Sequence, residues 1–163
     1  MGNDGAYFSR ELFEFLGELA LNNNREWFHA NKSRYESVVR DSLLEFVADF
    51  AEPLSKISSH FVADPRPSGG SMFRIYRDVR FSKDKSPYKT MAAAHFSHER
   101  AKEVPAPGFY LHLAPAESFV GVGIWHPDAT TLKNIRDTIV ANAAPIARAS
   151  FNVSVSPTIP RAS

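Results

Sequence analysis

The chain has 163 residues, of which 44% are hydrophobic and 23% charged, as in one globular domain. Its formal net charge of +1 argues against attraction of the whole surface to nucleic acid or to a membrane, although a local patch stays open. It has no cysteine, which excludes disulfides, thiolate catalysis and cysteine-ligated zinc.

The sequence also predicts no signal peptide and no membrane-spanning helix. Residues 1–10 lack the basic start and apolar run of a signal peptide. No window holds the roughly 18 apolar residues that a membrane-spanning helix needs. We therefore expect a cytoplasmic protein without a membrane partner.

The first third of the chain predicts a hairpin of two helices. Ser9 can cap the first helix, whose apolar residues between Leu12 and Ala20 share one face. The run Asn22–Asn24 ends it, because Asn tolerates turn geometry, and Asn24 can cap the next helix. That second helix keeps helical apolar spacing, and Pro53 is expected to end it.

The middle of the chain has strand periodicity. Apolar and polar residues alternate over Phe73–Val79, and Ala92–Phe96 is a short strand candidate. Phe109–Leu113 and Val120–Ile124 also alternate, with Pro115–Ser118 between them. We expect these last two strands to pair as an antiparallel hairpin.

The end of the chain returns to a helical pattern. Pro127-Asp128 starts a third helix, and Pro145 kinks or ends it. The predicted fold is therefore α+β: an N-terminal helical hairpin, an antiparallel sheet and a closing C-terminal helix against one sheet face. Residues 1–149 form a single domain in this prediction. Residues 150–163, rich in Ser and Pro, form a poorly ordered tail.

One basic segment, residues 74–89, is the part of the sequence dense enough to carry chemistry. It holds six Lys and Arg residues against two Asp, a net charge of +4, so the rest of the chain sums to −3. Arginine forks match phosphate and carboxylate groups, and lysines add point charges. The predicted ligand-binding residues are Arg74, Arg77, Asp78, Arg80, Asp84, Lys85 and Tyr88.

Arg77 has a special place in this segment. On a strand it lies on the apolar face, between Ile75 and Val79. A guanidinium there must be paired, because it cannot be neutralised. The partners open to it are Asp78, Glu26, Glu36 or a bound anion.

Three functions compete for this segment. We favour a binding site for a phosphorylated or other anionic small molecule. The first alternative is a nucleic-acid-binding module in which Tyr76, Phe81 or Tyr88 stacks on bases, although the near-neutral total charge weakens it. The second is a scaffold protein whose Arg/Asp pairs are internal and need no ligand.

Other catalytic signals are weak. His95 and His98 fall on opposite faces of a strand, and although His112 and His126 could meet, we predict no metal site. No nucleophile elbow, His-Glu-x-x-His or phosphate-binding loop motif is present. The catalytic residues, the cofactor, the oligomeric state and whether the chain is an enzyme stay open.

The basic segment also carries a family resemblance. The run from Arg74 to Lys89, RIYRDVRFSKDKSPYK, resembles the signature of a conserved hypothetical bacterial family, domain of unknown function 2461. Asn23–Phe28, Gly108–Leu113 and the Gly121/Gly123 strand agree with it, and the likeness spans about Phe13 to Ile146. The resemblance implies no activity, cofactor or catalytic residue. It supports the same site candidates, with Phe81 added.

The resemblance has one departure. Family members usually continue through a further C-terminal portion, and Phe151–Ser163 does not look like that portion. From the sequence we therefore expect a truncated or frame-shifted product.

Overall fold

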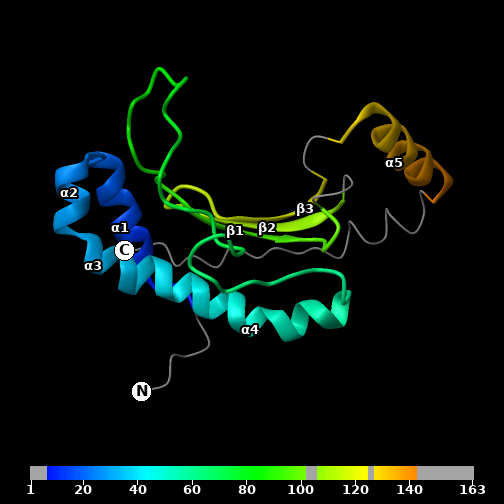
Figure 1. Ribbon diagram of the computed structural model, residues 1–163, viewed down its shortest axis with the longest axis horizontal. Coiled ribbons are helices and arrows are strands. Elements are labelled where there is room, and N and C mark those ends of the chain that lie inside the picture. The colour runs from blue at the N-terminus through cyan, green and yellow to red at the C-terminus, as the bar shows by residue number, and fades with distance from the viewer. Residues whose placement is uncertain (1–6, 102–105, 125–126, 143–163) are drawn as a thin grey trace, which may run out of the picture. The chain divides into compact units, whose positions relative to one another are not determined.

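The computed structural model describes residues 7–101, 106–124 and 127–142 (Figure 1). The chain divides into two compact units, Met1–Trp125 and His126–Ser163. The first unit holds four α-helices, a π-helix and a three-stranded sheet in its described residues. The predicted tail, residues 150–163, and the predicted domain boundary at 149 lie outside the described residues.

The first two helices begin where the sequence predicts. Helix α1 (Arg10–Leu21) follows Ser9, and its apolar face is fully buried. Helix α2 (Arg25–Ala30) follows Asn24, whose side-chain oxygen accepts a hydrogen bond from the Trp27 amide at 2.9 Å. This bond satisfies one of the free amides of the first turn, so Asn24 is a true cap.

The predicted second helix is not one continuous α-helix. It consists of α2, α3 (Lys32–Tyr35), a π-helix η1 (Glu36–Asp41) and α4 (Ser42–Ile57). An apolar residue recurs every four positions and is buried each time; these residues are Tyr35, Val39, Leu43 and Val47. An α-helix has about 3.6 residues per turn, so residues spaced four apart move gradually around its axis. A π-turn holds more residues than an α-turn, and it therefore keeps this row closer to one face.

The sequence predicts that Pro53 ends the second helix, and this prediction is wrong. The helix passes through Pro53 and ends at Ile57. Proline removes one backbone donor and crowds the preceding turn. Leu54, directly after it, is fully buried, and this packing holds the last turn in helical form.

The sheet has the predicted strands and is antiparallel throughout. Strands β1 (Ala92–Ser97), β2 (Gly108–Leu113) and β3 (Phe119–Gly123) lie in the order β1-β2-β3. Helix α4 runs along one face of the sheet and contacts β1 (Figure 1). Phe96 of β1 packs edge-on against Phe50 of α4, with 5.0 Å between ring centroids. The α+β prediction is confirmed.

The predicted strand at 73–79 is the exception. The chain there is extended, but it makes only isolated bridges, Met72 to Ala94 and Tyr76 to Tyr88. The Phe73 amide still bonds β1, at the Ala93 carbonyl (2.9 Å). Beyond that point the chain leaves the sheet edge and pairs with its own return, so no continuous strand forms.

The described part of the second unit holds helix α5 (Ala129–Ala141). Its start is the predicted one, because Asp128 accepts a hydrogen bond from the Thr131 amide at 2.8 Å. Across the described ranges of both units, no helix combines the length and apolar character that crossing a bilayer requires.

Candidate functional site

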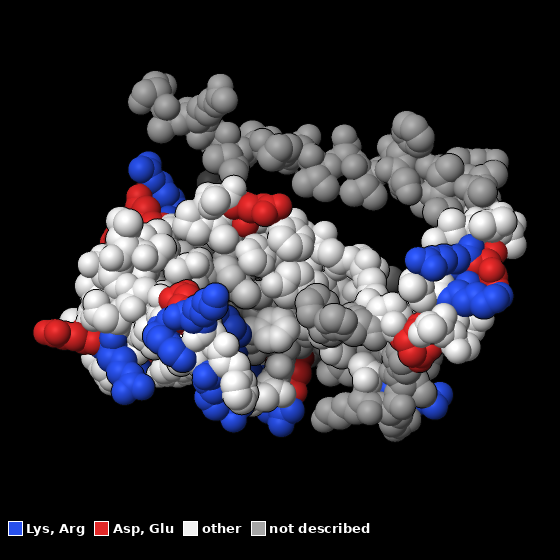
Figure 2. Space-filling view, turned by 90° about the horizontal axis from the view of Figure 1, so that it is seen from above, with Lys and Arg blue, Asp and Glu red and all other residues white. Residues whose placement is uncertain are grey.

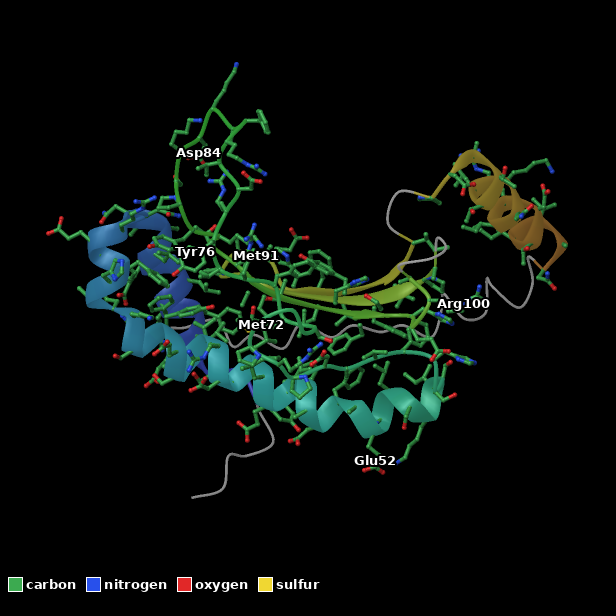
Figure 3. The ribbon with its side chains drawn as sticks, viewed as in Figure 1. Glu52, Met72, Tyr76, Asp84, Met91 and Arg100 are labelled. Atoms are coloured by element: carbon green, nitrogen blue, oxygen red, sulfur yellow. The ribbon has the colours of Figure 1, made fainter. Side chains whose placement is uncertain are left out.

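Residues 77–87, here called the basic loop, project from the side of the sheet opposite α4 (Figures 1 and 3). Two backbone bonds close its base: the Arg77 amide donates to the Pro87 carbonyl at 2.9 Å, and the Lys89 amide to the Ile75 carbonyl at 2.8 Å. Asp84 lies out in the loop and Tyr76 at its base (Figure 3). The loop is thus a two-stranded projection rather than a strand of the sheet.

Two contacts fasten the base of the loop to the helices. The Asn23 side chain donates to the Tyr88 carbonyl at 3.0 Å and accepts from the Tyr88 amide at 3.1 Å. The Tyr88 ring stacks on Phe28 of α2 with 4.0 Å between centroids. Tyr88 is only 3% exposed, so its ring has no free face for a base. Asn23 is a positioning residue that the sequence signal did not single out.

Both carboxylates of the basic segment are occupied by arginines. Arg77 pairs with Asp84 through Nη1 and Oδ2. The Arg80 guanidinium holds Asp78 with two nitrogens, at 2.9 and 2.6 Å. The partner of Arg77 is therefore none of the carboxylates expected from sequence, because the loop folds Asp84 back onto it. Glu36, one of those expected partners, instead pairs with Arg40 at 2.7 Å.

Asp84 also organises the loop tip. Its Oδ1 accepts from the Ser86 amide (2.9 Å) and the Ser86 hydroxyl (2.6 Å). These Ser86 bonds, then the Arg77 bond, hold the pKa of Asp84 well below its ordinary value of 3.8. The ionised carboxylate is the form that the loop needs.

This shift predicts an acid-sensitive loop. Because the pKa of Asp84 is lowered by folding, its contribution to stability is present above about pH 4 and is lost as the pH falls further. We expect Asp84→Asn to be less stable than wild type near neutral pH, with a gap that narrows progressively in acid. Urea denaturation across that range measures the gap; a gap independent of pH would contradict the assignment.

The remaining cations of the segment form no ion pair with a carboxylate among the described residues, although, after the hydrogen bonds from Arg80, the charge of Arg74 helps to lower the pKa of Asp78. Lys85 donates to the Val79 carbonyl at 3.0 Å and Lys89 to the Arg74 carbonyl at 2.9 Å. Within the described part of the chain, the side chains of Arg74 and Lys83 make no hydrogen bond or ion pair. Figure 2 looks down on the side from which the basic loop projects, where blue side chains gather around it.

Arg74 borders a hollow of about 220 Å³, here called the Arg74 hollow. The segment 72–76 forms one wall, and residues of α2, α3 and η1 form the other. Lys32 of α3 lines it as well, and its side chain, like that of Arg74, makes no hydrogen bond or ion pair within the described ranges. Arg40 and Glu36, on the π-helix, complete the charged lining, and Arg40 pairs both with Glu36 and with Asp41. Lys32 is a site residue that the sequence analysis missed.

The other predicted site residues are spread out. Arg77, Asp84 and Tyr88 line a second hollow of about 390 Å³, together with Asn23 and Lys89. Asp78, Arg80 and Lys85 line neither of these two hollows. The structure thus brings three of the seven predicted residues to one hollow and places Arg74 at another.

Metal binding finds no support in the described part of the chain, where no group of three or more potential ligands is close enough to hold an ion. His98 instead stacks on His60 with 5.3 Å between ring centroids. Nδ1 of His112 is hydrogen-bonded to the Tyr110 hydroxyl at 3.0 Å. His126 lies outside the described residues.

The fold and the site define a two-layer α+β protein with a cation-rich loop anchored beside its helices. The chain belongs to the conserved hypothetical protein family DUF2461, whose sequence model matches residues 11–157. The match includes residues 151–157, part of the segment that we expect from sequence to depart from the family. No similar curated protein and no similar solved structure was found.

Proposed function

We propose that the protein binds a small anionic molecule, such as a phosphorylated one, in the Arg74 hollow. One observation carries the proposal: Arg74 and Lys32, from separate elements, border the same hollow, and neither side chain forms an ion pair within the described residues. Arg74 and Lys32 add two positive charges to a lining whose one carboxylate among the described residues, Glu36, is paired with Arg40. An anion in the hollow would be attracted by both cations.

The size and lining of the hollow indicate the ligand. A volume of about 220 Å³ suits a phosphate or carboxylate group on a small body rather than a nucleotide. Phe28, Tyr35 and Tyr76 supply apolar and aromatic walls. An arginine fork and a lysine ammonium together match the three oxygens of a phosphate.

The ion pairs of the basic loop take a supporting role in this proposal. Arg77 and Arg80 are held by Asp84 and Asp78, as in the scaffold alternative. They shape the loop, while Arg74, at its base, remains open to a ligand. The nucleic-acid alternative loses Tyr88 as a stacking ring, because that ring is buried against Phe28.

The test is calorimetric titration of the protein with inorganic phosphate. We expect saturable binding that weakens about tenfold or more in Arg74→Ala and in Lys32→Ala, since a charge-assisted hydrogen bond contributes about 1.5–3 kcal/mol. Lys56→Ala is the matched control, because Lys56 pairs with Glu52 on α4 and does not line the hollow.

Two results would contradict the proposal. In the first, the two hollow variants and the control bind phosphate equally. In the second, phosphate does not bind but a single-stranded oligonucleotide does, with an affinity that falls steeply with salt; this result would favour the nucleic-acid alternative.

A further inference from the structure

The sheet face opposite α4 has an unusual row of small residues. In the register of the sheet, His95, Tyr110 and Gly121 lie side by side, and the next row is Ser97, Gly108 and Gly123. Side chains alternate along a strand, so these rows face away from the row of Phe96, Phe109 and Val122. Three of the six positions on this face are glycine.

A hollow of about 620 Å³, here called the sheet hollow, lies over these glycines. Phe73, Met91 and Tyr110 are among its walls, and Gly121 and Gly123 lie along its floor. The volume is within the range of small-molecule sites, and the lining is largely apolar with few polar groups, as in such sites. It shares only Phe73 with the Arg74 hollow.

The two glycines of β3 are not required by the backbone. Neither has a positive φ, since Gly69 is the single such glycine in the described ranges. A Cβ built on Gly123 meets no atom within 4 Å, and one on Gly121 meets nothing nearer than 4.0 Å. Glycine weakens a strand by about 0.5–1 kcal/mol relative to alanine. What the two glycines provide is open space above the sheet.

Gly108, unlike Gly121 and Gly123, has no room for a side chain. A Cβ there would clash with Nε2 of His95, so this glycine is needed for internal packing. His95 in turn is fixed by a 2.9 Å hydrogen bond between its Nδ1 and the Ser97 hydroxyl. The open space is therefore confined to the β3 side of the sheet hollow.

Among the described residues, one charged side chain lines the sheet hollow, that of Lys89. Lys89 Nζ donates to the Arg74 carbonyl and lies 5.3 Å from the centre of the Phe73 ring. No carboxylate lines the sheet hollow among the residues that the structure describes. Partial burial, and next the charge of Arg74, lower the pKa of Lys89. An acidic group from a ligand would supply the missing counter-charge.

We propose that the sheet hollow is a second binding site, for a small molecule with a flat apolar body and one acidic group. The apolar body lies over Gly121 and Gly123, and the acidic group meets Lys89 Nζ. The proposal does not depend on anion binding in the Arg74 hollow, because the two sites use different cations. Charge complementarity and open volume favour such a ligand over a protein segment.

The probe for this site is anilinonaphthalene sulfonate, an apolar aromatic body with one acidic group. We expect saturable one-to-one fluorescence binding to the folded protein. Gly123→Leu fills the sheet hollow and should weaken binding at least tenfold. Val120→Leu is the matched control, because Val120 is on the opposite face of the same strand and 69% exposed; it should bind as wild type.

A second pair of measurements tests the acidic group. Lys89→Met should also weaken the probe at least tenfold, whereas uncharged anilinonaphthalene should bind wild type and Lys89→Met equally. The thermal midpoint of Gly123→Leu reports its folding, and we expect it to equal or exceed that of wild type. Gly121→Ala, a smaller filling of the same hollow, should give a smaller loss in the same direction.

Three outcomes would overturn the proposal. Gly123→Leu and Gly121→Ala, both folded, could bind the probe as wild type does. Wild type could bind it without saturation. Wild type could also fail to bind the probe, whether sedimentation shows the protein to be a monomer or a dimer. Loss of phosphate binding in Arg74→Ala, with the probe still bound, would separate this site from the Arg74 hollow.

Discussion

Phe28→Ala should lower the free energy of unfolding by about 3–5 kcal/mol, the usual cost of removing a buried phenyl ring. Phe28 is 2% exposed and stacks on Tyr88, with 4.0 Å between ring centroids. It also contacts the Tyr35 ring at 5.3 Å. The cavity left by alanine would therefore open where α2, α3 and the base of the basic loop meet.

The matched control for this substitution is Phe81→Ala. Phe81 lies in the basic loop and is 96% exposed, so its removal should change the free energy of unfolding by no more than about 0.5 kcal/mol. Urea denaturation of the three proteins measures both effects. Similar losses in the two variants would show that the Phe28–Tyr88 stack does not anchor the loop.

Asn23→Ala should have the next largest effect, a loss of about 1–3 kcal/mol. The side chain makes both a donated and an accepted bond to the Tyr88 backbone, across 65 residues of sequence. Alanine leaves the amide and carbonyl of Tyr88 without their partners in a partly buried place. Unsatisfied groups of this kind cost more than the mean hydrogen bond contributes.

Asn22→Ala is the control for Asn23, because its side chain bonds only the exposed Glu18 carbonyl of its own helix, at 2.9 Å. It should lose far less stability. Hydrogen exchange gives a second readout, since the Tyr88 amide should exchange faster in Asn23→Ala and not in Asn22→Ala. Unchanged protection of that amide in Asn23→Ala would refute the anchoring role.

Much of the fold could be predicted from local chemistry. Asn24 and Asp128 cap helices as their sequence positions indicate, and the alternation around Leu111 predicts a strand. The π-helix was also visible in principle, in the four-residue spacing of its buried row, but an α-helical period describes that row almost as well. Pro53 was wrongly predicted to end α4, because burial of Leu54 outweighs the missing amide.

The site was harder to predict, because it depends on contacts between distant residues. The charge excess of residues 74–89 is visible from composition, but the pairing of Arg77 with Asp84 depends on how the basic loop folds back. Lys32 has no motif around it, and its place beside Arg74 follows from the packing of α3 against residues 72–76. Asn23 likewise shows its role only through Tyr88.

Binding of an anion in the Arg74 hollow, by cations that form no ion pair within the described residues, is tested most directly by nuclear magnetic resonance. Inorganic phosphate is added to isotopically labelled protein, and the backbone amide shifts are followed. We expect saturating shifts centred on residues 32–36 and 73–76, which disappear in Arg74→Ala. Shifts that are absent, spread evenly over the surface, or unchanged by Arg74→Ala would contradict it.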